Sequence, residues 1–224
     1  MQIIVVGMGK LATELLGSLA AGSAAPVFPW AQGVHKRQRS IVIHAGSGRE
    51  LQAVLAYCAH TQSTLIELAT GSDIGTLAPS FPVVVCPNTN ILMLKFMSMM
   101  EKCGPLFRKH SIELTESHQA DKSSVPGTAV TIARALGLKD SDVRSVRDPA
   151  LQETVLQVPA EHLARHAYHQ IHIDEGACSL RFEARVYGET AYADGVARIV
   201  AAVRAQQLEN RLYSIMEFVD AGWL

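Results

Sequence analysis

MQIIVVGMGKLATELLGSLAA, residues 1–21, joins a short β-branched run to a helix-forming run through a glycine-rich turn. The run at residues 3–6 is apolar on both faces, which is typical of a strand buried in a parallel sheet. Gly7, Gly9 and Ala12 form the pattern G-x-G-x-x-A between strand and helix. Such glycines permit a tight turn and close approach of a ligand to the backbone, and the alanine lets helix and strand pack closely. The stretch predicts an α/β fold with a Rossmann-like parallel sheet.

This turn is also a candidate dinucleotide site, because the N-terminus of the following helix offers free N–H groups and partial positive charge to a pyrophosphate. We expect the contacts to come from the turn and the first helical residues: Gly7, Gly9, Lys10 and Leu11. The pattern is short, so a plain glycine turn without a ligand remains the alternative.

The segment after the second expected strand, residues 25–31, bears on which nucleotide is bound. Rossmann domains usually carry an acidic residue about 20 positions after the glycines, where it binds ribose hydroxyls. Residues 15–49 contain no Asp or Glu, whereas Lys36, Arg37 and Arg39 are basic. Basic side chains suit a 2′-phosphate, so NADPH is favoured over NADH. The alternative is a solvated basic loop.

Three further runs end in small or polar residues after an apolar strand: SIVIHAGS (40–47), STLIELATGSD (63–73) and FPVVVCPNTN (81–90). A helix is expected between the first two. Carboxyl ends of parallel strands form the ligand crevice of such sheets, so the nicotinamide should lie there. The expected contacts are the residues at these ends: Ala45, Gly46, Thr70, Gly71, Asn88 and Asn90.

Composition excludes several classes of protein. The chain has 224 residues, 48% hydrophobic and 18% charged, which argues against disorder. A net charge of −1 without a concentrated basic stripe argues against nucleic acid as a partner. The four cysteines have no C-x-x-C spacing, so neither a zinc site nor a redox dithiol is indicated. No run is long enough for a membrane span, and the chain opens on a strand instead of a leader, so we expect a cytoplasmic protein.

The chemistry is expected in KHSIELTESHQADKSSVPGTAVTIARAL, residues 109–136. SIELTES alternates between polar and apolar residues, like a strand with one solvent-exposed face. His118 and Lys122 follow it, shortly before a helix that starts near Gly127. A helix start can bind an anionic substrate, histidine can shuttle protons near neutral pH, and lysine can supply a proton or a positive charge. The alternative is a surface histidine beside a solvated lysine.

ELTESHQADKSSVPGTA, residues 113–129, resembles the signature of the dihydrodipicolinate reductase family, E-x-x-E-x-H-H-x-x-K-x-D-x-P-S-G-T-A. The rest of the chain agrees in order over nearly its full length. VVVCPNTNIL (83–92) is similar to the family's hinge strand A-x-N-F-S-x-G, and RLYSIMEFVD (211–220) to its closing L-Y-x-M-x-D-V-L.

The resemblance implies a two-domain subunit. Residues 1–89 and 202–224 would form the NAD(P)H-binding domain, and residues 90–201 a second α+β domain with an open mixed sheet. That sheet would carry the substrate loop and build a homo-oligomer, a tetramer or a dimer. The implied activity is NAD(P)H-dependent reduction of a dihydrodipicolinate-type cyclic imine in the diaminopimelate–lysine pathway.

The resemblance also implies roles for single residues. His118 would stand at the family's catalytic histidine, and Lys122 would donate the proton when hydride reaches the ring. Gly127 and Thr128 would bind a substrate carboxylate through a backbone N–H and a hydroxyl. Gln119 could donate a hydrogen bond to a carboxylate, and His169 is expected to face the substrate.

The match departs from the family mainly on the substrate side. Gln119 replaces the second histidine, Ser124 replaces the aspartate, and NTN (88–90) replaces N-F-S. The family's S-x-R-x-G-D-x-x-G-x-H stretch is poorly matched: Arg144, Arg147 and Asp148 lie in that region, and either His166 or His169 could stand at its last histidine. Three functions therefore stay open: a dihydrodipicolinate reductase, a reductase of the same fold with another imine or carbonyl substrate, and a nucleotide-binding homologue without catalysis.

Histidines at 162, 166, 169 and 172 could suggest a metal site. No acidic or cysteine partner has ligand spacing, so no metal is expected. The alternation in YHQIHID (168–174) indicates a strand with His169 and His172 on opposite faces.

Overall fold

The computed structural model describes residues 1–22, 25–30, 38–69, 73–76, 78–123, 126–188 and 190–224. They form two compact units, Met1–Ile91 with Tyr192–Leu224, and Leu92–Ala191. The chain returns to the first unit at Tyr192, earlier than the boundary expected at residue 202. The reason is that α6 (Thr190–Ala205) packs on the first unit: a Cβ at Gly195 would lie 1.7 Å from the carbonyl oxygen of Thr89.

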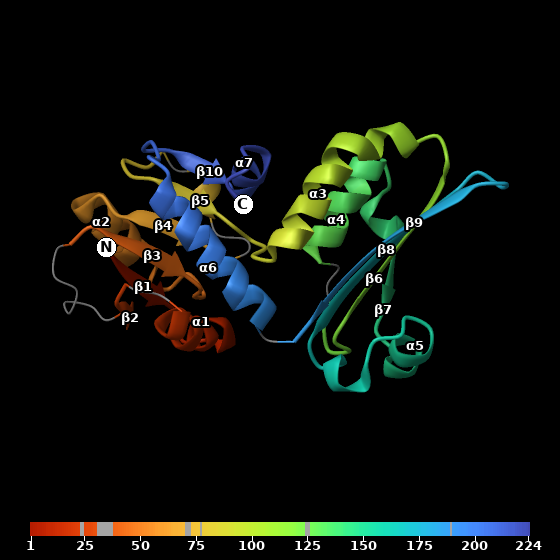
Figure 1. The fold of residues 1–224 in the computed structure, drawn as a ribbon, viewed down its shortest axis with the longest axis horizontal. Helices are drawn as coiled ribbons and strands as arrows, with labels where there is room; N and C mark the ends of the chain where they lie inside the picture. The colour runs from red at the N-terminus through yellow and green to blue at the C-terminus, as the bar shows by residue number, and fades with distance from the viewer. Residues whose placement is uncertain (23–24, 31–37, 70–72, 77, 124–125, 189) are drawn as a thin grey trace. The chain divides into compact units, whose positions relative to one another are not determined.

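The first unit is built on a six-stranded sheet in the order β10-β5-β4-β3-β1-β2, with every neighbouring pair parallel (Figure 1). Its strands are β1 (Gln2–Val6), β2 (Val27–Pro29), β3 (Ser40–His44), β4 (Thr64–Glu67), β5 (Val83–Val85) and β10 (Leu212–Ser214). The predicted Rossmann-like parallel sheet is confirmed.

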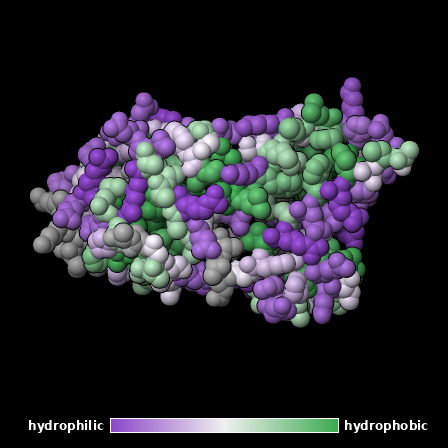
Figure 2. Space-filling model, viewed as in Figure 1, coloured by the Kyte–Doolittle hydropathy of each residue, from purple (hydrophilic) through white to green (hydrophobic). Residues whose placement is uncertain are grey.

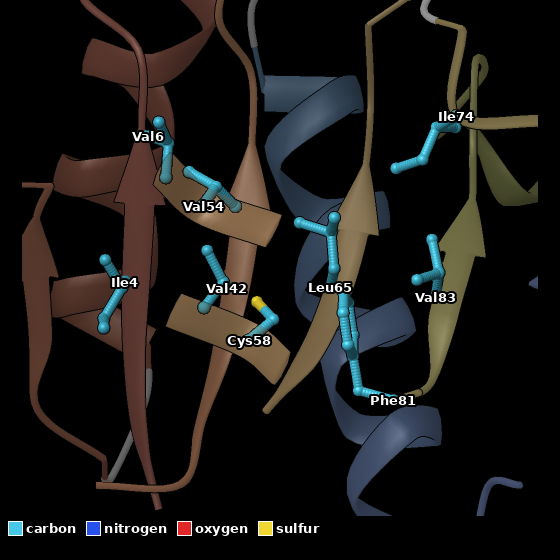
Figure 3. Packing of buried hydrophobic residues seen from close by; sticks show 9 residues of the cluster. All are labelled: Ile4, Val6, Val42, Val54, Cys58, Leu65, Ile74, Phe81 and Val83. Carbon is cyan, nitrogen blue, oxygen red and sulfur yellow. The ribbon is translucent and has the colours of Figure 1, made fainter. Parts of the chain in front are cut away.

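Helices of the first unit connect these strands: α1 (Lys10–Gly22), α2 (Leu51–Thr61), η1 (Asp73–Thr76), α6 and α7 (Ile215–Asp220). One face of the sheet packs against α2 through Val54 and Cys58 (Figure 3). Each of the central strands β1, β3 and β4 is almost fully buried, which explains why they appear in the sequence as continuous apolar runs. The cluster on the α2 side consists of Ile4, Val6, Val42, Val54, Cys58, Leu65, Ile74, Phe81 and Val83.

The second unit is built on a four-stranded mixed sheet in the order β7-β6-β8-β9. Its strands are β6 (Ser111–His118), β7 (Val143–Val146), β8 (His166–Asp174) and β9 (Ser179–Tyr187). β6 pairs with β7 in parallel and with β8 antiparallel, and β8 pairs antiparallel with β9. The helical segments are α3 (Ile91–Cys103), η2 (Gly104–Phe107), α4 (Gly127–Leu136), η3 (Asp140–Asp142), α5 (Pro149–Thr154) and η4 (Ala160–His162).

Strand alternation gives this sheet two different faces. Leu114, Ile171 and Ile173 pack with α3 and α4 on one face, and Tyr168 packs with Val146 on the other. His169 continues the first face and His172 the second, which confirms that they lie on opposite faces. The methionine-rich helix α3 buries Met93 and Met100. Hydrophobic side chains also reach the surface of this unit (Figure 2). The exposed ones include Leu92 and Met99 on α3 and Leu106 on η2.

None of the helices in the described part of the chain is both long enough and apolar enough to cross a bilayer. Within the same ranges, no group of three or more His, Cys, Asp and Glu side chains is arranged to hold a metal ion.

Candidate functional site

The glycine turn after β1 is packed on one side and open on the other. Gly7 has φ 128°, and a Cβ there would lie 2.6 Å from the carbonyl oxygen of Ala45. A Cβ at Gly9 would meet no atom within 4 Å, and Gly9 and Lys10 are exposed at the start of α1. Thus Gly7 is required by the fold, whereas Gly9 leaves the backbone open to a ligand. This shape fits the approach of a pyrophosphate.

The strand order places a topological switch point at this turn. β1 lies between β2 and β3, so the chain crosses from one side of β1 to the other. In open α/β sheets this is where a nucleotide binds. Ala45 and Gly46 follow β3 directly, and beyond β5 the backbone N–H of Asn90 donates to Asn88 Oδ1 at 2.9 Å. The other predicted cofactor contacts lie outside the described residues: Lys36, Arg37, Thr70 and Gly71.

A buried polar pair, which the sequence did not reveal, lies at the carboxyl ends of β3 and β4. His44 and Glu67 end β3 and β4, are register partners and have no exposed surface. His44 Nδ1 lies 2.8 Å from both carboxylate oxygens of Glu67, and Glu67 Oε1 also accepts the N–H of Ala69 at 2.8 Å. A Cβ at Gly46 would lie 3.0 Å from His44 Nε2, so this pair supports the loop that packs on Gly7.

The predicted catalytic histidine belongs to a polar cluster at the end of β6. His118 Nδ1 lies 2.8 Å from Glu116 Oε2, two residues earlier on the same strand face. The ring of His169 is edge-on to that of His118, with centroids 5.7 Å apart. His169 is the cross-strand partner of Glu116 in the β6–β8 register. The sheet therefore brings together two predicted site residues that are 51 positions apart in the sequence.

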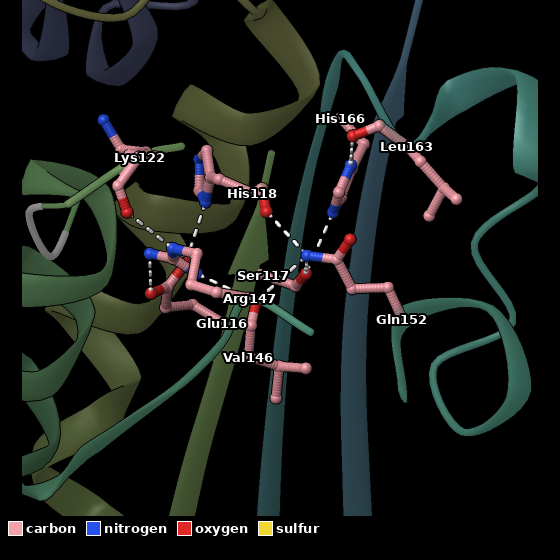
Figure 4. A network of polar contacts seen from close by, with 9 residues as sticks. All are labelled: Glu116, Ser117, His118, Lys122, Val146, Arg147, Gln152, Leu163 and His166. Carbon is pink, nitrogen blue, oxygen red and sulfur yellow. Dashed lines mark hydrogen bonds and ion pairs between the residues drawn. The ribbon is translucent and has the colours of Figure 1, made fainter. Parts of the chain in front are cut away.

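Arg147, directly after β7, completes this cluster. Its Nη2 donates to Glu116 Oε1 at 2.6 Å and its Nη1 to Glu116 Oε2 at 3.2 Å. Its Nε donates to the backbone carbonyl of Lys122 at 2.9 Å. One guanidinium thus binds both the carboxylate behind His118 and the turn that carries Lys122 (Figure 4).

The protonation states of the cluster follow from burial and hydrogen bonding. Burial by itself would raise the pKa of the Glu116 carboxyl. Hydrogen bonds from three neighbours outweigh burial and lower that pKa to about 2; they come from His118, Arg147 and Ser145. Burial, helped by the nearby charge of His118, lowers the pKa of His169 to about 4. At neutral pH the cluster therefore contains an ionised Glu116 and a neutral His169.

A second network holds the backbone of His118 from the other face of the sheet. Gln152 Nε2 donates to the carbonyl oxygen of His118 at 2.7 Å and to Ser117 Oγ at 3.0 Å. Ser117 Oγ lies 2.9 Å from Nε2 of His166, whose Nδ1 faces the carbonyl of Leu163 at 3.2 Å (Figure 4). Burial lowers the pKa of His166, so it acts here as a neutral acceptor for the serine hydroxyl.

The predicted substrate loop is described on both sides of residues 124–125. The backbone N–H of Lys122 donates to the carbonyl of Gln119 at 3.0 Å, which closes a turn after β6. Gln119 lines a cavity of about 440 Å³ together with Asp121, Gln152 and Leu163. Gly127 and Thr128 open α4 after the N-cap residue Pro126.

Glu116, Arg147 and Gln152 are the site residues that the sequence argument did not assign. The alternation of β6 could have indicated Glu116, because it is two positions from His118 on the same strand. The roles of Arg147 and Gln152 depend on how β7 and α5 pack beside β6, which no local pattern records.

No protein-family model matches the sequence. The chain is 31% identical over 153 residues to the probable 4-hydroxy-tetrahydrodipicolinate reductase 1, chloroplastic, of Oryza sativa subsp. japonica. It is 30% identical over 153 residues to the 4-hydroxy-tetrahydrodipicolinate reductase 2, chloroplastic, of Arabidopsis thaliana. Each match covers 62% of this chain but only 45% and 44% of the relatives, so the chain matches less than half of their length.

Solved structures share the fold. A dipicolinate-bound dihydrodipicolinate reductase from Paenisporosarcina sp. TG-14 superposes with a TM-score of 0.62 at 15% identity, covering 96% of this chain and 97% of that one. C. glutamicum DAP dehydrogenase in complex with DAP gives a TM-score of 0.51 at 8% identity, with coverages of 97% and 93%. In sequence the chain is thus similar to 4-hydroxy-tetrahydrodipicolinate reductases, and it shares its fold with a dihydrodipicolinate reductase.

Proposed function

We propose that the chain is an NAD(P)H-dependent reductase of a dihydrodipicolinate-type cyclic imine in the diaminopimelate–lysine pathway. The observation that carries this proposal is the cluster of His118, Glu116 and His169 at the end of β6, next to the turn with Lys122. The names of the sequence relatives support the same reaction.

The first unit has a suitable place for a dinucleotide. The open backbone at Gly9 and the start of α1 would hold the pyrophosphate, and Ala45, Gly46 and the Asn88–Asn90 turn would lie along the nicotinamide half. The bound nucleotide would supply the hydride. The basic residues Lys36, Arg37 and Arg39 favour NADPH over NADH.

The second unit would bind the substrate and supply a proton. Because Glu116 is ionised, it accepts the Nδ1–H of His118, and the Nε2 of that ring is left to accept or carry another proton. The Lys122 ammonium would give a proton to the ring atom next to the carbon that receives hydride. The N–H of Gly127 and the hydroxyl of Thr128 would hold a carboxylate, with Gln119 and His169 lining the same site.

A second candidate is a reductase of the same fold that takes a less highly charged imine or carbonyl compound. Gln119 cannot carry the positive charge of the family's second histidine. Arg147 is paired with Glu116, and His169 is neutral at pH 7. A doubly negative substrate would therefore find fewer positive charges here than the family motif offers.

An NAD(P)H-oxidation assay coupled to dihydrodipicolinate synthase tests the proposal, with wild type, His118→Ala and Lys122→Ala compared in both nucleotides. We expect wild-type turnover and losses of about 100-fold or more in the variants. Near-full activity of Lys122→Ala would refute the assigned proton donor. Nucleotide binding without turnover would favour the second candidate, or a homologue that has lost catalysis.

Nucleotide preference is measured by fluorescence titration with NADPH and NADH. The homo-oligomer, a tetramer or dimer, stays a prediction that sedimentation velocity would test. The cytoplasmic location also stays a prediction; the sequence relatives are named as chloroplastic proteins.

A further inference from the structure

We infer that Glu116 and Arg147 form a positioning pair that sets the tautomer of His118 and anchors the turn carrying Lys122 at the same time. This role rests on the proposed function, and it would keep the His118 ring and the Lys122 turn at a fixed spacing. Neither residue would act on the substrate itself. Both would act through the groups that do.

The first part of the inference concerns the histidine ring. The carboxylate of Glu116 has no exposed surface, and its Oε2 lies 2.8 Å from His118 Nδ1. An ionised carboxylate can only accept hydrogen bonds, so the neutral His118 must carry its proton on Nδ1. Only Nε2, on the far side of the ring, is then free for proton exchange. His118 is 14% exposed, so the ring reaches the surface of the unit.

The second part concerns Arg147, whose guanidinium uses all three nitrogens. Nη1 and Nη2 bind Glu116, Nη1 also donates to the carbonyl of Val146 at 3.0 Å, and Nε binds the carbonyl of Lys122. The planar fork fixes the directions of these bonds relative to one another. A shift of the Lys122 turn would therefore strain the contact to Glu116, and with it the orientation of His118.

Other charged and titratable groups around His118 do not compete for this role. His169, from β8, is neutral at pH 7 and presents its ring edge-on. His166 lies on the opposite face of the sheet and is engaged by Ser117. Gln152 contacts His118 at its backbone carbonyl and not at its ring. Glu116 thus fixes the orientation of the His118 ring, and Arg147 fixes the orientation of the Glu116 carboxylate.

Nitrogen-15 NMR of the histidine side chains tests the first part without substrate or cofactor. We expect neutral His118 in the wild type to be the Nδ1–H tautomer. In Glu116→Gln, which keeps the shape of the side chain, we expect that preference to weaken, because the charged acceptor that holds the Nδ1–H is removed. A wild-type Nε2–H tautomer, or an unchanged tautomer ratio in the variant, would overturn the inference.

Arg147→Lys tests the second part, because lysine keeps the charge but cannot make the forked contact. We expect hydrogen exchange at the Lys122 amide, which closes the Gln119 turn, to become about tenfold faster. Arg134→Lys is the matched control, since Arg134 forms an exposed ion pair with Asp140 in the same unit. Equal exchange in wild type and Arg147→Lys would contradict the inference.

These readouts separate the inference from the proposed reaction. If the coupled assay shows no turnover but the tautomer and the hydrogen exchange are as expected, only the proposed reaction is refuted. If the enzyme turns over but the two variants keep the wild-type tautomer and exchange rate, only the positioning role of Glu116 and Arg147 is refuted.

Discussion

The imidazole of His169 stands edge-on to that of His118, with ring centroids 5.7 Å apart and ring planes at 83°. His169 is 2% exposed, and neither of its ring nitrogens has a hydrogen-bond partner in the described part of the chain. Burial lowers its pKa to about 4. At pH 7 a neutral ring therefore lies against His118 on this face of the sheet.

The first prediction concerns stability against pH. The unfolded chain binds a proton at His169 near pH 6.5, whereas the folded chain does so only near pH 4. Proton binding at His169 therefore does not reduce the free energy of unfolding above about pH 6.5. Below that pH the unfolded chain is protonated first, so stability is lost progressively as the pH falls toward 4. The free energy of unfolding, measured with urea, should fall between pH 7.5 and pH 5 by about 2 kcal/mol more in wild type than in His169→Gln. Parallel pH profiles of the two proteins would contradict this assignment.

The second prediction separates the two glycines of the first turn. Gly7→Ala should destabilise the fold, because φ is 128° and the new Cβ would lie 2.6 Å from the Ala45 carbonyl oxygen. Gly9→Ala should leave the melting temperature nearly unchanged, since its Cβ meets nothing within 4 Å. It should nevertheless weaken NADPH binding about tenfold or more by obstructing the pyrophosphate. Unchanged NADPH affinity in Gly9→Ala would argue for a plain structural turn.

The third prediction compares two helical glycines of the first unit. A Cβ at Gly195 in α6 would lie 1.7 Å from the carbonyl oxygen of Thr89, whereas one at Gly17 in α1 meets nothing within 4 Å. Gly195→Ala should lower the free energy of unfolding by about 3 kcal/mol or more. Gly17→Ala should raise it by up to about 1 kcal/mol through helix propensity. Similar effects at both sites would show that α6 does not approach Thr89 closely.

The fourth prediction concerns the buried pair His44 and Glu67 at the ends of β3 and β4. Glu67→Ala removes both acceptors from His44 Nδ1 and should cost about 3 kcal/mol in chemical denaturation, because the partner is left buried and unpaired. The double variant His44→Leu/Glu67→Leu should recover much of that loss. Glu209→Ala, at an exposed carboxylate, should change stability by less than about 0.5 kcal/mol. Additive losses in the double variant would argue against a coupled pair.

Much of the fold could be predicted from local sequence. The apolar run of β1 and the glycine pattern after it specify strand, turn and helix through contacts among a few consecutive residues. The alternation in β8 correctly placed His169 and His172 on opposite faces, because the side-chain period of a strand is two. The motif around His118 and Lys122 was found in the same way, since its spacing lies within one loop.

Only the tertiary structure decided which side chains contact the residues around His118 and Lys122. Glu116 meets His169 through the β6–β8 register, Arg147 reaches Glu116 from the end of β7, and the His44–Glu67 pair depends on the β3–β4 register. These contacts join residues 23 to 53 positions apart. Sequence periodicity fixes the face on which a side chain lies, but strand pairing and packing fix its neighbour, and polar neighbours are what set protonation and orientation.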